Sequence, residues 1–149
     1  MKRTIAREIA VRLCYAVELN GYTSDEVLDE LFSEEYYSGL ASEDGVFLSF
    51  PDKKNLEYIY AIVKGVCTHK KELDEYISKY SIGWKTTRIS KTALAVLEVA
   101  IFEMLYMQDV PISVSANEAV ELSKKYEEDD IVPFINGVLG SFTRSEIIK

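Results

Sequence analysis

The chain has 149 residues, of which 48% are hydrophobic and 28% are charged. This length suits one domain, or two small subdomains that share a core, and it needs no disulfide or metal ion to fold. Cys14 and Cys67 lie in apolar helical patterns, so we expect reduced core cysteines. The first residues contain no apolar signal segment, and no stretch approaches the roughly 18 apolar residues of a membrane span. A cytoplasmic protein is therefore expected.

The charge of the chain is both negative and uneven. Its 17 Lys and Arg against 25 Asp and Glu give a net charge of −8, which disfavours non-specific nucleic-acid binding because the mean field repels phosphate. Residues 1–15 are nevertheless basic, whereas residues 16–52 contain many carboxylates and no Lys or Arg. Separate faces for separate partners are one interpretation, and solvated helix faces are the simpler one for the acidic block. The basic residues of the first segment are Lys2, Arg3, Arg7 and Arg12.

Apolar spacing predicts two helices at the start of the chain. Residues 4–19 carry apolar side chains every three or four positions, and Gly21 should end this helix. The hydroxyl of Ser24 is expected to cap the second helix. Residues 37–52 are rich in Gly and Ser and are interpreted as a long irregular connection. The two buried stripes are Ile5, Ile9, Leu13 and Ala16, then Val27, Leu28, Leu31 and Phe32.

A third apolar pattern extends over residues 52–80. This is long for one globular helix, so we expect a bend near His69. The break around Gly83 then divides the chain into halves. We predict a single domain with subdomains of about residues 1–82 and 83–149.

The second half begins with a helix that is apolar on every side. It should open at Ser90 or Thr92 and run to Met107, and such a helix is surrounded by others. Ser115, with Glu118 three residues later, forms a capping-box pattern for the next helix.

That helix should end near Tyr126, and Asp129 or Asp130 should cap the last one. Pro133 is tolerated in its first turn and Gly140 is the expected stop. No segment sustains the alternation of a β-strand. The predicted class is all-α, a helical bundle.

Few residues suggest catalysis. His69 is the single histidine, and the positions three and four residues later hold Glu72 and Leu73, which do not make a metal site. The sequence contains no glycine-rich phosphate loop, nucleophile elbow or CxxC motif. We therefore expect a protein that is not an enzyme and that needs no cofactor or metal.

The basic amino terminus is the first unusual feature of the sequence. Arg3 and Arg7 are four residues apart, so they share a helix face that points away from the Ile5 and Ile9 stripe. Two such guanidinium groups can reach two phosphates together, and the amino terminus of a helix itself attracts anions.

The carboxyl-terminal third contains the second unusual feature. Asn117 and Glu118 interrupt no apolar stripe and are expected at a cap or on a helix surface. Asn136 and Gly137 fall inside an apolar helix, where the glycine costs about 1 kcal/mol relative to alanine. Close packing of Gly137 against another element would explain its presence.

Together these motifs resemble the NusB family of bacterial transcription antitermination factors. The similarity extends from Arg7 to Leu139 and is most specific in two motifs, P-x-x-V-x-x-N-E-A-V-E-L-x-K from Pro111 and F-I-N-G-V-L from Phe134. Other matching positions are Ala6-Arg7-Glu8, Tyr15, Gly65-Val66, His69, Glu72-Leu73-Asp74, Trp84 with Arg88, and the helix from Ala95 to Glu103.

The resemblance implies two perpendicular three-helix bundles. It also implies binding of boxA RNA in ribosomal RNA leader transcripts, jointly with the ribosomal protein NusE. That complex would help RNA polymerase to pass terminators, together with other Nus factors.

The resemblance further implies which residues meet RNA. They are Lys2, Arg3 and Arg7 in the basic amino terminus, Tyr15 on the RNA-facing surface, Asp130 as an acidic position that tunes RNA affinity, and Phe134 and Asn136 in the last motif. The basic run is thinner than in the family, and Glu98 stands where the central helix of relatives often has an arginine.

About three cationic contacts would make log K fall with log salt at a slope of roughly −2. A basic partner such as NusE would be attracted to the acidic faces and add RNA contacts of its own. The alternative is a NusB-like module that binds only protein, or itself as a homodimer, with little RNA affinity.

Overall fold

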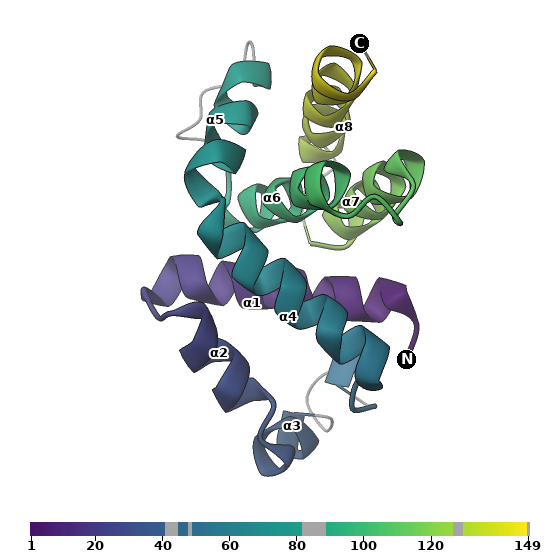
Figure 1. The fold of residues 1–149 in the computed structure, drawn as a ribbon. Helices are drawn as coiled ribbons and strands as arrows, with labels where there is room; N and C mark the ends of the chain where they lie inside the picture. Colours follow the sequence, from purple (N-terminus) through teal and green to yellow (C-terminus); the bar gives the residue numbers. More distant parts are fainter. Residues whose placement is uncertain (41–44, 48, 82–88, 127–129, 149) are drawn as a thin grey trace. The chain divides into compact units, whose positions relative to one another are not determined.

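The computed structural model describes residues 1–40, 45–47, 49–81, 89–126 and 130–148, with the backbone alone at 34–36 (Figure 1). Within these ranges the chain forms helices and no strand, which confirms the all-α class. None of the described helices combines the length and the apolar character needed to cross a membrane.

The chain divides into two compact units, Met1–Cys67 and Thr68–Lys149. We expected the division near Gly83, which lies outside the described residues, as do Trp84 and Arg88. Residues 70–80 belong to the second unit because their helix packs on two helices of that unit. The detail of two three-helix bundles is not confirmed, since each unit has four described α-helices, α1–α4 in the first and α5–α8 in the second.

The first unit begins with α1 (Arg3–Asn20) and α2 (Ser24–Leu31). Gly21 ends α1 as predicted, with a φ of 71° that favours glycine. The cap of α2 lies one residue before the predicted Ser24. The Thr23 hydroxyl accepts a hydrogen bond from the Glu26 amide, and the Glu26 carboxylate accepts one from the Thr23 amide.

The segment predicted as an irregular connection, residues 37–52, includes the end of α3 (Glu34–Leu40) and the short 3₁₀ helix η1 (Gly45–Phe47). An aromatic cluster orders it. The ring of Tyr37 lies within 5.0–5.8 Å of the rings of Phe32, Phe47 and Phe50. The Tyr37 hydroxyl donates to the Ser49 carbonyl at 2.8 Å, and burial raises its pKa to about 12. The prediction is wrong for residues 37–40 and 45–47, which are helical and pack through these aromatic side chains.

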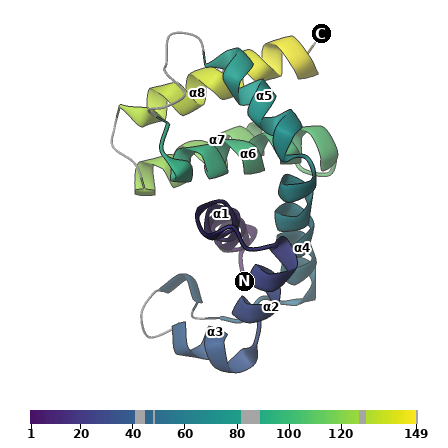
Figure 2. The same ribbon diagram turned by 90° about the vertical axis from the view of Figure 1, so that its left-hand side faces the viewer.

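Helix α4 (Lys53–Thr68) passes across α1 and completes the first unit (Figures 1 and 2). It ends directly before His69, where α5 (Lys70–Tyr80) begins, so the long apolar pattern is interrupted at the predicted residue. Tyr58 and Ile62 are buried, whereas Leu56, Tyr60 and Cys67 are only half-buried.

The second unit is arranged around α6 (Lys91–Tyr106), with α5, α7 (Ile112–Tyr126) and α8 (Ile131–Phe142) against it (Figure 2). Ser90 caps α6 by accepting a hydrogen bond from the Ala93 amide. This confirms Ser90, one of the two predicted starts of the helix. Eleven residues of α6 are buried, which confirms a central helix.

Two predictions in this unit were wrong. Ser115 does not cap α7, because the helix begins three residues earlier and the Ser115 hydroxyl instead donates to buried Glu103 at 3.2 Å. Gly140 does not stop α8. The helix continues to Phe142, which is fully buried between Tyr76 and Tyr80, and a π-helical turn over Thr143–Ile147 follows.

Candidate nucleic-acid interface

The basic amino terminus is held against the first turn of α4. The Nε of Arg3 donates to Oδ1 of Asn55 at 2.9 Å, and the Arg3 guanidinium lies 4.2 Å from the centre of the Tyr58 ring. Lys2 and Arg3 are both exposed. The stacking and the hydrogen bond limit the conformations of Arg3 while they leave its terminal nitrogens able to meet a phosphate.

Asn55 connects three groups and is itself buried. Its Nδ2 donates to the Met1 carbonyl at 2.8 Å and to Oδ1 of Asp52 at 2.7 Å. The Asp52 carboxylate also lies 3.8 Å from the terminal ammonium group, and its hydrogen bond from Asn55 lowers its pKa. The amino-terminal residues are therefore fixed at both their backbone and their side chains.

Helix α4 contributes two further cations near the amino terminus, which were not predicted from the sequence. Lys53 and Lys54 are exposed and directly precede Asn55, so they add positive charge beside the amino terminus. We call Lys2, Arg3, Lys53 and Lys54 the basic cluster. An asparagine at the start of a helix is a common cap signal, and nothing local in the sequence distinguishes Asn55 from such a cap.

Arg7 does not lie on the exposed face that its spacing predicted. Only 3% of the residue is exposed, and its guanidinium lies 5.6 Å from the centre of the Tyr58 ring. Arg3 and Arg7 thus contact the same ring, but only Arg3 presents its head group to solvent. The structure supports a structural role for Arg7 rather than a direct phosphate contact.

Tyr15 is not brought together with the basic cluster. It is half-buried on α1, twelve residues after Arg3. At 1.5 Å and 100° per residue, it lies roughly 18 Å along the helix from Arg3 and is turned about 120° from it. Its role toward RNA stays a prediction.

The remaining candidates lie in the second unit. Asp130 is exposed at the amino end of α8, where its side chain makes no capping hydrogen bond. Asn136 is exposed, but Phe134 is only 2% exposed, so its ring cannot stack on a base. A shallow pocket of 530 Å³ between α7 and α8 is lined by Asn136 together with Asn117 and Lys124. The two sequence motifs therefore meet at one surface.

Gly137 does not pack closely against another element, contrary to the prediction. A Cβ atom built on it would meet no atom within 4 Å, and the residue is exposed. The glycine therefore leaves open space beside Asn136.

Three charged residues, of which only Glu98 is buried, connect α5 to α6. The Oε2 of Glu98 accepts a hydrogen bond of 2.6 Å from Nζ of Lys70, which also lies 3.2 Å from Asp74. Burial raises the pKa of Glu98 from its usual 4.5 to about 8, and the Asp74 carboxyl acts in the same direction while Lys70 opposes it. Glu98 occupies a position within the core, which explains why it does not add to the surface charge.

The described fold defines an all-helical protein with a cluster of exposed cations beside its amino terminus. The model of the NusB family matches residues 4–144. The chain is 37% identical to the transcription antitermination protein NusB of Acetivibrio thermocellus over 149 residues, which are 100% of this chain and 93% of that protein. It is 33% identical to NusB of Bacillus subtilis over 95% of this chain and 94% of the relative. The chain belongs to the NusB family.

Solved structures agree in fold. NusB of T. maritima superposes with a TM-score of 0.79 at 25% identity, over 97% of this chain and 92% of the other. The NusB chain from a crystal structure of antitermination factors NusB and NusE in complex with dsRNA has a TM-score of 0.75 at 21% identity, over 96% of both chains.

Proposed function

We propose that this protein is a transcription antitermination adaptor that binds boxA-type RNA of ribosomal RNA leader transcripts together with the ribosomal protein NusE. Its membership in the NusB family supports the class of function, and relatives carry the name transcription antitermination protein. RNA binding is supported above all by Arg3, which is exposed and is held in place by Tyr58 and Asn55.

The adaptor acts in the cytoplasm, where transcripts are made, and it reaches RNA polymerase indirectly through other Nus factors. It has no catalytic role. Binding and positioning of RNA and protein are sufficient for such a function.

The charge of the chain supports a composite RNA site. With a net charge of −8, the protein repels phosphate at long range, and the basic cluster offsets this locally. A basic protein bound beside the RNA would neutralise part of the acidic surface and add contacts of its own. RNA binding is therefore expected to be weak for the adaptor alone and strong with NusE.

The second candidate is an interaction module with little RNA affinity. The burial of Arg7 favours it, because one of the three cations assigned to RNA is not available at the surface. A titration of fluorescent boxA RNA, with and without purified NusE, separates the two functions. Tighter RNA binding by the mixture than by NusE alone supports the adaptor, whereas equal binding supports the interaction module.

A further inference from the structure

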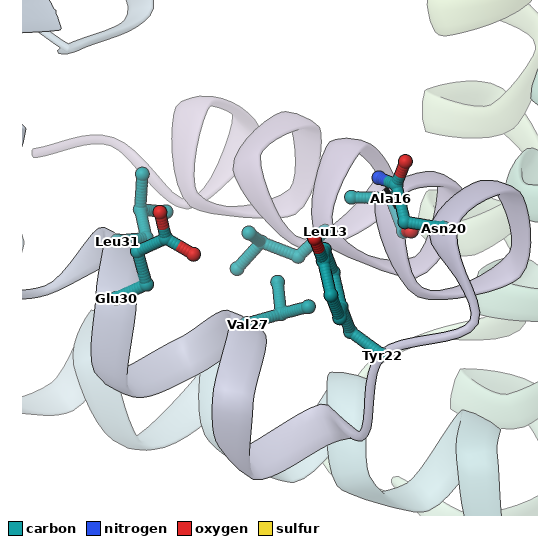
Figure 3. A pocket seen from close by; sticks show the side chains of 7 residues that line it. All are labelled: Leu13, Ala16, Asn20, Tyr22, Val27, Glu30 and Leu31. Atoms are coloured by element: carbon teal, nitrogen blue, oxygen red, sulfur yellow. Dashed lines mark hydrogen bonds between the residues drawn. The ribbon is translucent and has the colours of Figure 1, made fainter.

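A pocket of 370 Å³ opens between α1 and α2 in the first unit (Figure 3). Figure 3 shows the side chains of Leu13 and Val27 pointing toward each other between the two helices, with Glu30 at one end and Asn20 at the other. Leu13, Val27 and Leu31 are buried and form an apolar floor. This volume is large enough to receive a large aliphatic or aromatic side chain.

Large apolar side chains at the rim remain exposed. Tyr22 lines the pocket and is 52% exposed, and Leu19, next to the lining residue Asn20, is 51% exposed. Exposed apolar groups beside a pocket with an apolar floor are typical of a protein-interaction site.

The charge around the pocket restricts its occupant. Residues 16–52 contain no Lys or Arg, and α2 alone contributes four carboxylates. Asp25 pairs with Lys64 at 3.1 Å and Glu26 closes the capping box, but Asp29 and Glu30 have no ion-pair partner in the described part of the chain. This negative field repels RNA, and it also disfavours a second copy of a chain that is itself acidic. A segment with Lys or Arg next to an apolar side chain is the complementary occupant.

We propose that this pocket receives an apolar side chain from a Lys- or Arg-rich segment of a protein partner. The proposal rests on the proposed function, which makes NusE that partner. The apolar side chain fills the space between Leu13 and Val27, while the flanking cations lie beside Glu30. The pocket thus gives the acidic block a function as one half of a protein interface.

Two variants test the two parts of this interface. Ala16→Leu fills the pocket with a residue that favours helix, and Glu30→Lys reverses the charge at its end. Each should weaken the binding of purified NusE roughly tenfold or more, as expected for excluding one large apolar side chain. The Glu30→Lys effect should shrink at high salt, whereas the Ala16→Leu effect should persist. Asp109→Lys, in the exposed turn after α6, makes the same change of charge away from the pocket and is the matched control.

Calorimetric titration with NusE, melting curves and RNA titration of the same variants give distinct outcomes. NusE affinity equal to wild type in both variants overturns the pocket proposal and leaves the proposed function intact. Failure of the wild-type protein itself to bind NusE overturns the proposed function. If Ala16→Leu lowers the melting temperature, its loss of binding is not used, and the NusE affinity of the exposed Glu30→Lys variant alone tests the proposal. A loss of self-association in sedimentation, or a loss of RNA binding without NusE, assigns the pocket to another occupant and overturns the proposal.

Discussion

The Nε of Arg3 donates a hydrogen bond of 2.9 Å to Oδ1 of Asn55 and so joins the first turn of α1 to the first turn of α4. Asn55 also donates to the Met1 carbonyl. The cations proposed to meet RNA are consequently part of the packing of the first unit, and not a loose basic tail.

Replacing Asn55 by Ala should destabilise the first unit by about 1–3 kcal/mol, because it removes a buried amide with several hydrogen bonds. A double-mutant cycle with Arg3→Ala should give a coupling energy of about 0.5–1.5 kcal/mol in urea unfolding. Asn20→Ala is the matched control, since that exposed amide donates only to the Ala16 carbonyl. Additive effects of the Asn55 and Arg3 changes would contradict the anchoring role.

Replacing Arg7 by Ala should lower stability by about 1–3 kcal/mol, since its stem and guanidinium are buried beside Tyr58. Arg144→Ala removes an exposed arginine and should change stability much less. Thermal unfolding of the two variants measures the difference. If both melt like the wild type, Arg7 is not a packing residue and the original assignment to RNA regains support.

Stability should fall as pH rises from about 4.5 to about 8 because of Glu98. Its pKa is raised in the folded protein, so the folded state keeps the proton over this range while the unfolded state loses it. Its stabilising contribution is complete below pH 4.5 and is lost as pH passes the folded value near 8. Glu98→Gln should remove this loss, because its amide imitates the protonated acid.

Urea unfolding of the wild type and Glu98→Gln from pH 4.5 to 9 measures this effect. The variant should gain stability relative to the wild type toward alkaline pH, and Glu121→Gln, an exposed change in α7, should not. If the free energies of unfolding of the wild type and Glu98→Gln differ by the same amount at every pH, the pKa of Glu98 is not raised in the folded protein.

Gly137→Ala should stabilise the protein by about 0.5–1 kcal/mol, because the helix gains a better helix former and the new methyl group meets open space. Gly21→Ala should instead destabilise it, since the φ of 71° strains any side chain. Melting temperatures of the two variants should therefore move in opposite directions. A lower melting temperature for Gly137→Ala would show that the glycine has a packing role after all.

Features that depend on neighbouring residues were predictable from the sequence. Gly21, Ser90 and the helix break at His69 act within one turn of their own helix, so local patterns identified them. The apolar circumference of α6 also sufficed to place it at the centre of its unit.

Features that depend on distant residues were not predictable in this way. Arg3 and Asn55 are 52 positions apart in the sequence, and the burial of Arg7 beside Tyr58 depends on the same approach of α4 to α1. Ser115 matches a capping box by pattern, yet the buried Glu103 carboxylate on α6 takes its hydroxyl. In each case a tertiary partner decided between two roles that the local sequence allowed.

The salt dependence of boxA RNA binding in the presence of NusE shows whether the basic cluster contacts phosphate groups. Each cation that contacts a phosphate of single-stranded RNA contributes roughly 0.7 to the slope of log K against log salt. Lys2→Ala should weaken binding and reduce the slope by about that amount, whereas Lys91→Ala, an exposed lysine at the start of α6, should leave both unchanged. Equal affinities and slopes for Lys2→Ala and the wild type would show that the basic cluster does not bind RNA through Lys2.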